Sequence, residues 1–229
     1  MAEQFEVVQE GEYPASPDRV WQAVTADTAA WLFPAGGGEE IVWEPPTHRV
    51  NRMDGPDGWF NHLEQVIEAS ADGRSSLRWV HRGVLPPGTT DATGIELHTA
   101  FYLHTLAEYL EHFDGRQAVF VDVQGPSESM TQDAFEVVRA AIGVDPDAVV
   151  GTIAEGELPL VSSDAILDYS NAHFIGLRTD DALYRFFGRN AFGGPVGLTV
   201  HHFGDADADE LQVEWQQWLD GLFGSDAPE

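Results

Sequence analysis

The sequence predicts an α+β protein made of two similar halves, and three observations support this. Residues 94–115 contain no proline and no interior glycine, and their apolar residues recur at helical spacing. Several short runs alternate apolar and polar residues, as strands do, and turns rich in Gly, Pro and Asp separate them. This order of elements starts again after Gly115. Each half is therefore expected to contain a sheet and a closing helix.

The long helix is the element around which the first half is expected to be organised. Asp91 or Thr93 can serve as its N-cap, and Gly115 suits its C-terminal end. About 20 residues of helix span roughly 30 Å, so a broad sheet is needed to cover it. The face predicted to be buried carries Ile95, His98, Tyr102, Thr105, Leu106, Tyr109 and Phe113.

Before this helix, the first half reads as one strand, one short helix and four more strands. Ser16 followed by Pro17 is a typical helix start, with Ser16 as the N-cap and Pro17 at the first helical position. Val20 and Trp21 then begin the apolar side of that helix. The predicted strands are 5–13, 40–43, 49–53, 59–68 and 75–82.

The second half repeats this order. A helix is expected over 130–142, and Asp207 or Asp209 can cap a final helix whose apolar stripe includes Trp215. The halves 1–115 and 116–229 have nearly equal lengths, which favours a degenerate duplication; two unrelated α+β pieces are the alternative. The predicted strands are 118–123, 149–153, 158–161, 165–171, 172–177, 183–187 and 196–203.

The charge excludes some classes of partner. The chain has 39 acidic and 11 basic residues, a formal net charge of −28, and all its basic residues are arginines. Such a chain should repel phosphate backbones and anionic membrane surfaces, so we expect no nucleic-acid or membrane partner. Two explanations remain open: a generally solvated acidic surface, or a specific acidic face that docks a basic partner. With no cysteine and no signal-like or long apolar segment, we expect a cytoplasmic monomer or homodimer.

The motifs of several catalytic and cofactor sites are missing from the sequence. Nine histidines invite a metal hypothesis, but no HExxH occurs, and adjacent His201 and His202 would face opposite sides of a strand. No GxSxG occurs, and the glycines 36–38 lack phosphate-loop spacing. We therefore expect no metal and no cofactor, and leave the question of catalysis open.

The segment from Ala15 to Trp21, the strand 59–68 and the Gly94 entry to the long helix resemble the START-like helix-grip superfamily, also called SRPBCC. Within it, the sequence is similar to bacterial homologues of the activator of heat-shock-protein-90 ATPase. The resemblance covers 1–115 well and 116–229 weakly, and the chain departs from the pattern in lacking a clear final strand before the long helix. It implies a curved antiparallel sheet wrapped on a long C-terminal helix, with a hydrophobic cavity between them.

The resemblance implies binding of a small, mainly hydrophobic ligand in that cavity. In the strand 75–82, Trp79 and His81 share one face, so both are expected to face the helix. One alternative is a cyclase or hydrolase-type enzyme with His81 or His98 as acid or base; another is a protein that interacts with a chaperone ATPase. The expected ligand-binding residues are Trp31, Trp59, Trp79, His81, His98, Phe101 and Tyr102.

The charge leads to a first prediction. Self-repulsion among the carboxylates opposes the compact state, and added salt screens it. The melting temperature, measured by circular dichroism, is expected to rise between very low and moderate NaCl concentration. An unchanged or lower value would mean that local partners already compensate the carboxylates.

Overall fold

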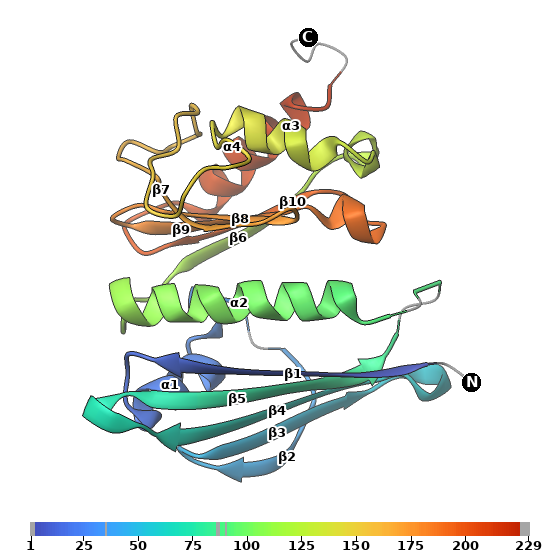
Figure 1. The fold of residues 1–229 in the computed structure, drawn as a ribbon, viewed down its shortest axis with the longest axis vertical. Helices are drawn as coiled ribbons and strands as arrows, with labels where there is room; N and C mark the ends of the chain where they lie inside the picture. Colours follow the sequence, from blue (N-terminus) through green and yellow to red (C-terminus); the bar gives the residue numbers. More distant parts are fainter. Residues whose placement is uncertain (1–2, 35, 86–87, 90, 225–229) are drawn as a thin grey trace. The chain divides into compact units, whose positions relative to one another are not determined.

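A computed structural model of the chain describes residues 3–34, 36–85, 88–89 and 91–224. The chain divides into two compact units, Met1–Gly115 and Arg116–Glu229. Among the described residues, each unit contains one five-stranded antiparallel sheet and two α-helices (Figure 1). This confirms the predicted α+β class.

In the first unit the sheet has the strand order β1-β5-β4-β3-β2, with all neighbours antiparallel. Helix α2 runs alongside β1, and α1 lies against β4 and β5 (Figure 1). A single sheet with its long closing helix packed on it is the helix-grip arrangement. The elements are β1 Gln4–Tyr13, α1 Pro17–Thr25, η1 Thr28–Ala30, β2 Glu39–Glu44, β3 His48–Asp54, β4 Phe60–Ala69, β5 Ser75–Val84 and α2 Thr93–His112.

Helix α1 begins as predicted from its local sequence. The Ser16 hydroxyl accepts a hydrogen bond from the Arg19 backbone N–H, and Pro17 occupies the first turn. The Arg19 side chain then joins α1 to the C-terminal part of α2. It donates to the Tyr109 hydroxyl at 2.6 Å and to Asp27 at 2.7 Å, and it also pairs with Asp114.

The buried face of α2 differs in part from the predicted one. Thr105, Leu106 and Tyr109 are buried as predicted, but His98 and Tyr102 are only partly buried. The N-cap is Ala92 rather than Asp91 or Thr93, but the Asp91 carboxylate accepts a hydrogen bond of 2.9 Å from the backbone N–H of Thr93, the first residue of the helix. The helical period alone does not show how far each flank of a helix is covered. The buried residues of α2 that the predicted face did not include are Thr99, Phe101, Leu103 and Leu110.

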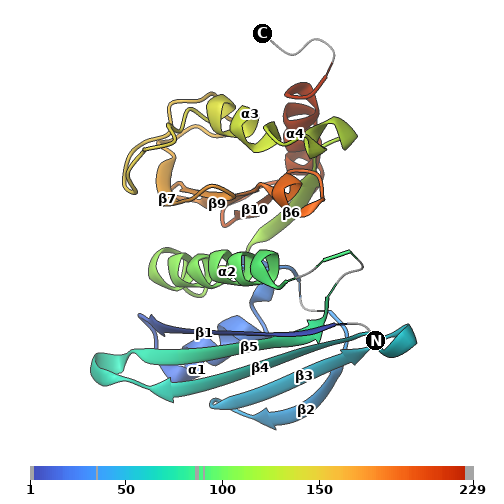
Figure 2. The ribbon, with the colours of Figure 1, turned by 45° about the vertical axis from the view of Figure 1, so that its right-hand side comes forward.

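The second unit has the strand order β6-β10-β9-β8-β7, which is the same topology as in the first unit. Helices α3 and α4 both lie on one face of this sheet (Figure 2). The fold therefore confirms a second helix-grip-like half. The elements are β6 Val119–Gln124, α3 Ala134–Ala141, β7 Ile166–Ser170, β8 Phe174–Arg178, β9 Ala182–Phe187, β10 Gly197–His202 and α4 Ala208–Gly221, with 3-10 turns η4 Ser127–Met130 and η5 Arg189–Phe192.

Helix α4 closes the core of the second unit. The Asp207 carboxylate caps it by accepting from the backbone N–H groups of Asp209 and Glu210, as predicted. Trp215 is fully buried and packs against two aromatic residues of β9, with ring centroids 5.3 Å from Tyr184 and 6.3 Å from Phe186. These contacts anchor the helix to the middle of the sheet.

The prediction of strands at 149–153 and 158–161 was wrong. In the described chain both ranges belong to the connection between α3 and β7, and only Ile153 forms a single bridge, to Ile166. The valine and leucine content suggested strands. Two positive φ angles, at Gly151 and Leu160, interrupt the extended conformation there, and this interruption is not visible as a pattern in the sequence.

The connection is fixed to the end of α3 by close backbone contact. The N–H of Glu155 donates to the Gly143 carbonyl at 3.2 Å, and that of Gly156 donates to the Ile142 carbonyl at 3.1 Å. A Cβ atom at Gly156 would lie 2.3 Å from the carbonyl oxygen of Ala141. Only glycine allows the two backbones to approach this closely.

We predict that Gly156→Ala destabilises the protein by about 1–3 kcal/mol, because backbone atoms must shift to admit the new methyl group. The matched control is Gly221→Ala at the end of α4, where a Cβ meets open space and the change should be neutral or slightly stabilising. Urea unfolding of both variants measures the difference. Equal stability of the two variants would contradict this account of the contact.

Candidate ligand-binding site

The antiparallel register places one residue from each strand of the first unit in a row across the sheet. Gln9 of β1 lies opposite Trp79 of β5, which lies opposite Gln65 of β4. Gln65 in turn lies opposite Arg49 of β3, and Arg49 lies opposite Trp43 of β2. Because side chains at register partners share a face, these five point to the side where the helices pack. We call them the inner row.

Two polar members of the inner row bind carbonyl groups of the covering helices. The Gln9 amide donates to the Glu96 carbonyl in α2 at 2.8 Å. The Arg49 guanidinium donates to the Val24 carbonyl in α1 at 3.1 Å, and it pairs with the Glu40 carboxylate at 2.5 Å. The Arg49 charge is therefore already neutralised within the unit.

Gln65 lies between Gln9 and Arg49 in the inner row, but unlike them it binds no helix carbonyl in the described chain. Its side chain is fully buried, and within the described part of the chain neither its amide nitrogen nor its oxygen has a hydrogen-bond partner. Leaving such a group buried without a partner costs about 1–3 kcal/mol. Buried polar groups in folded proteins nearly always have a partner, so an exception of this kind calls for an explanation.

Aromatic residues surround the inner row. Trp31, which follows η1, is almost fully buried and meets Trp79 edge to face with ring centroids 6.0 Å apart. Its indole N–H donates to the Ala23 carbonyl at 2.9 Å. Two residues later, Phe33 meets Tyr102 of α2 at 5.8 Å. The segment from Trp31 to Phe33 thus connects the sheet side of the site to its helix side.

His81 is a titratable group beside the row, two residues beyond Trp79 on the same face of β5. One ring nitrogen, Nε2, donates to the Asn61 side-chain oxygen at 2.6 Å, and the ring lies edge to face against Phe5 at 4.9 Å. Burial lowers the pKa of His81 to about 4, because the charged imidazolium is poorly solvated there. The ring is therefore neutral at pH 7.

The structure brings three of the seven expected site residues together. Trp31, Trp79 and His81 lie on or beside the inner row, whereas Tyr102 of α2 contacts Phe33, two residues after Trp31 in the chain. His98 lies 6.3 Å from Tyr102, and its Nδ1 makes a local hydrogen bond of 2.6 Å to the Gly94 carbonyl.

The other two expected residues lie differently. Phe101 is fully buried in α2. Trp59 is 41% exposed, at the end of the turn in which the Gly55 N–H donates to its carbonyl. It stands just before β4, and the structure does not bring it to the inner row.

The amide groups of the site were not predicted from the sequence. Gln65 sits between Leu63 and Ile67 at alternating positions of β4, so an amide in the middle of an inward apolar series was a usable signal. Gln9 and Asn61 carried no such signal, because their roles depend on residues of other elements.

The described residues contain neither a metal-binding cluster nor a membrane-spanning helix. No group of three or more His, Asp or Glu side chains in 3–34, 36–85, 88–89 and 91–224 could hold a metal ion. No helix within these residues is both long and apolar enough to cross a membrane.

Comparison with known proteins gives similarities of fold only. No protein-family model matches the chain, and no curated protein matches it. Among solved structures, the Mll3558 protein from Rhizobium loti aligns over 48% of this chain and 99% of its own, with 21% identity and a TM-score of 0.41. The resemblance to activators of the heat-shock-protein-90 ATPase therefore stays a prediction.

Two other solved structures align with both units. DynU16, a protein in the dynemicin biosynthetic locus, covers 95% of this chain and 96% of its own, with 18% identity and a TM-score of 0.38. The di-domain ARO/CYC BexL from the BE-7585A biosynthetic pathway covers 87% of this chain and 85% of its own, with 10% identity and a TM-score of 0.41. The helix-grip assignment itself rests on the strand order and helix placement of this chain.

The lowered pKa of His81 predicts a pH dependence of stability. Because the folded-state value of about 4 is below the ordinary 6.5, the unfolded chain binds the proton first as the pH falls. Neutral His81 therefore makes its full contribution to the free energy of unfolding above pH 6.5. As the pH falls from 6.5 to 4, the free energy of unfolding decreases on account of His81 by at most about 3 kcal/mol. His81→Gln should lose less stability than the parent protein over this interval, measured by urea unfolding. Parallel pH profiles would show that His81 is not buried in its neutral form.

Proposed function

We propose that the first unit binds a small, mainly hydrophobic ligand in a cavity between the β1–β5 sheet and its covering helices. The observation that carries this proposal is the buried amide of Gln65, which lacks a partner within the described residues. A bound ligand with hydrogen-bonding groups would satisfy both atoms of the amide. The resemblance to START-like proteins, whose cavity lies in the same place, supports this location.

The surroundings of Gln65 favour a planar apolar ligand. Trp79 is its register neighbour, and Trp31 packs edge to face on Trp79. Aromatic walls contribute burial of apolar surface, while a few polar groups fix orientation, which is the usual composition of small-molecule sites.

The charges of the site favour a neutral ligand. Arg49 is paired with Glu40, and His81 is neutral at pH 7 because burial lowers its pKa. An anionic ligand would therefore find no uncompensated positive charge in the inner row. Gln65 offers one donor and one acceptor side by side, so the matching ligand group has an acceptor next to a donor, as a primary amide has.

The enzyme alternative, a cyclase or hydrolase-type activity, is favoured by one observation. Nε2 of His81 donates to Asn61, so in this tautomer the other ring nitrogen carries a lone pair that could accept a proton. If a ligand of this site is converted, His81→Gln should abolish turnover and leave binding within about threefold. Turnover that survives in this variant would exclude His81 as the base.

The proposal predicts opposite effects of Gln65→Leu on stability and on binding. Removing the amide should stabilise the ligand-free protein by about 1–3 kcal/mol, since no unpaired polar group remains. Binding of 2-naphthamide, whose amide can pair with Gln65, should weaken at least tenfold. Binding of 2-acetylnaphthalene, which has no donor, should weaken less. Urea unfolding and fluorescence titration give the two readouts.

A second variant tests the location. His98→Trp enlarges a side chain on the helix side of the site, beside Tyr102, and should abolish binding of both naphthalene probes in a protein that still folds. Probe binding that is unchanged in both folded variants, or a parent protein that binds neither probe, would overturn the proposal.

A further inference from the structure

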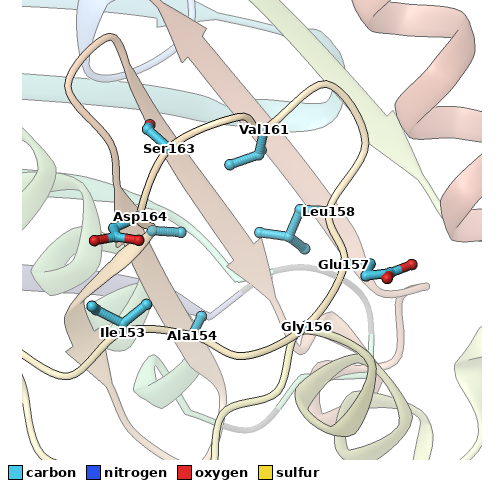
Figure 3. A pocket seen from close by; sticks show the side chains of 9 residues that line it. Ile153, Ala154, Gly156, Glu157, Leu158, Val161, Ser163 and Asp164 are labelled. Atoms are coloured by element: carbon cyan, nitrogen blue, oxygen red, sulfur yellow. The ribbon is translucent and has the colours of Figure 1, made fainter.

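The connection between α3 and β7, residues 142–165, forms a pocket of about 370 Å³ in the second unit (Figure 3). Both polar and apolar groups line it, and the apolar side chains of Leu158 and Val161 point toward its middle. The Asp164 carboxylate lies at its edge, whereas the Glu157 side chain points away from it. The pocket is lined by Ile153, Ala154, Gly156, Glu157, Leu158, Val161, Ser163, Asp164 and Ala165.

The pocket is held in place from two sides. On one side, backbone hydrogen bonds join Glu155 and Gly156 to the end of α3. On the other, the Ala154 N–H donates to the Ala165 carbonyl at 2.8 Å, and the N–H of Gly151 donates to the Leu167 carbonyl of β7, also at 2.8 Å. The shape of the pocket is therefore largely formed before any partner binds, which lowers the entropy lost on binding.

Exposed apolar side chains extend beyond the pocket on the same connection. Val149, Val150, Ile153 and Leu160 are each between 51% and 70% exposed. Leu160 also has a φ angle of 57°, which is unusual for a residue with a large side chain. Neighbouring exposed apolar residues of this kind often mark an interaction surface. Since three of the four lie outside the pocket lining, a small molecule filling the pocket would leave them uncovered.

The same connection is strongly acidic. The sequence contains no Lys or Arg between Arg139 and Arg178. Within the described ion pairs and hydrogen bonds, no cationic group neutralises the carboxylates of the connection. These exposed carboxylates belong to Asp145, Asp147, Glu155, Glu157 and Asp164.

These charges decide between possible occupants. A second copy of this chain, with a net charge of −28, would bring further carboxylates to an acidic surface. Nucleic acid and anionic membranes are repelled for the same reason. A polypeptide segment that carries basic and apolar side chains complements both features of the surface.

We propose that the connection 142–165 is a docking surface for a basic amphipathic segment of a partner protein. One apolar side chain of that segment enters the pocket between Leu158 and Val161. Its neighbours cover the exposed apolar residues such as Val150 and Leu160, and its Lys or Arg residues approach the surrounding carboxylates. This site is independent of the ligand site proposed for the first unit.

The test uses the full chain and a fluorescein-labelled 18-residue helical peptide of Leu and Lys with one apolar face, in fluorescence anisotropy at moderate salt. The parent protein should bind it, and should not bind the same peptide with Glu in place of Lys. The double variant Ile153→Ser/Leu160→Asn should weaken binding at least tenfold, and Asn tolerates the positive φ at position 160. The matched apolar control is Val213→Ser, an exposed residue of α4, and should change binding less than twofold.

Charge needs its own control, because any acidic protein attracts a basic peptide. Glu157→Gln/Asp164→Asn should weaken binding more than Glu96→Gln/Glu111→Gln, which removes the same charge from exposed positions of α2. Equal effects of the two charge pairs, or of the apolar pair and its control, would show nonspecific attraction and overturn the proposal. Failure of the parent protein to bind the Leu–Lys peptide would also overturn it. Unchanged circular dichroism confirms that each variant folds.

Discussion

The alternation of side chains along antiparallel strands is the constraint on which the first unit depends. It sends every second residue of β1, β4 and β5 to the side of the helices, so Gln9, Gln65 and Trp79 must share that side once the register is set. A slip of one residue would turn all of them to the other face. That face carries ion pairs such as Arg82 with Glu64, which suit solvent. The two faces are therefore not interchangeable.

Because the inner face is buried, each polar group on it needs a partner. The helices provide carbonyl groups for Gln9 and Arg49, and this joins the sheet to α2 and α1. Gln65 lies midway between these contacts and meets neither helix through a hydrogen bond in the described chain. The same packing that stabilises the fold thus leaves this amide without a partner among the described residues, which is why we propose that it recognises a ligand rather than stabilises the fold.

The two units share a strand order but differ in the connection between their first helix and second strand. In the first unit this connection carries Trp31, which packs on Trp79 of the inner row, and Phe33, which packs on Tyr102 of α2. In the second unit it is the acidic connection 142–165, with its pocket and exposed apolar residues. A repeated sheet and helix provide the same scaffold twice, and loops on such a scaffold are where new binding functions arise most readily.

Elements whose signals are local were predictable from the amino-acid sequence. Ser16 with Pro17 and the cap at Asp207 were readable because capping involves residues only two or three positions apart. The alternating strands and the repeated element order predicted two sheets of the same kind. The three-dimensional packing alone shows that Gln65 lacks a partner among the described residues and that 149–161 forms no strand. Both depend on groups far apart in the chain, a hydrogen bond that Gln65 does not receive and the contact between Gly156 and the end of α3, and no local pattern records such contacts.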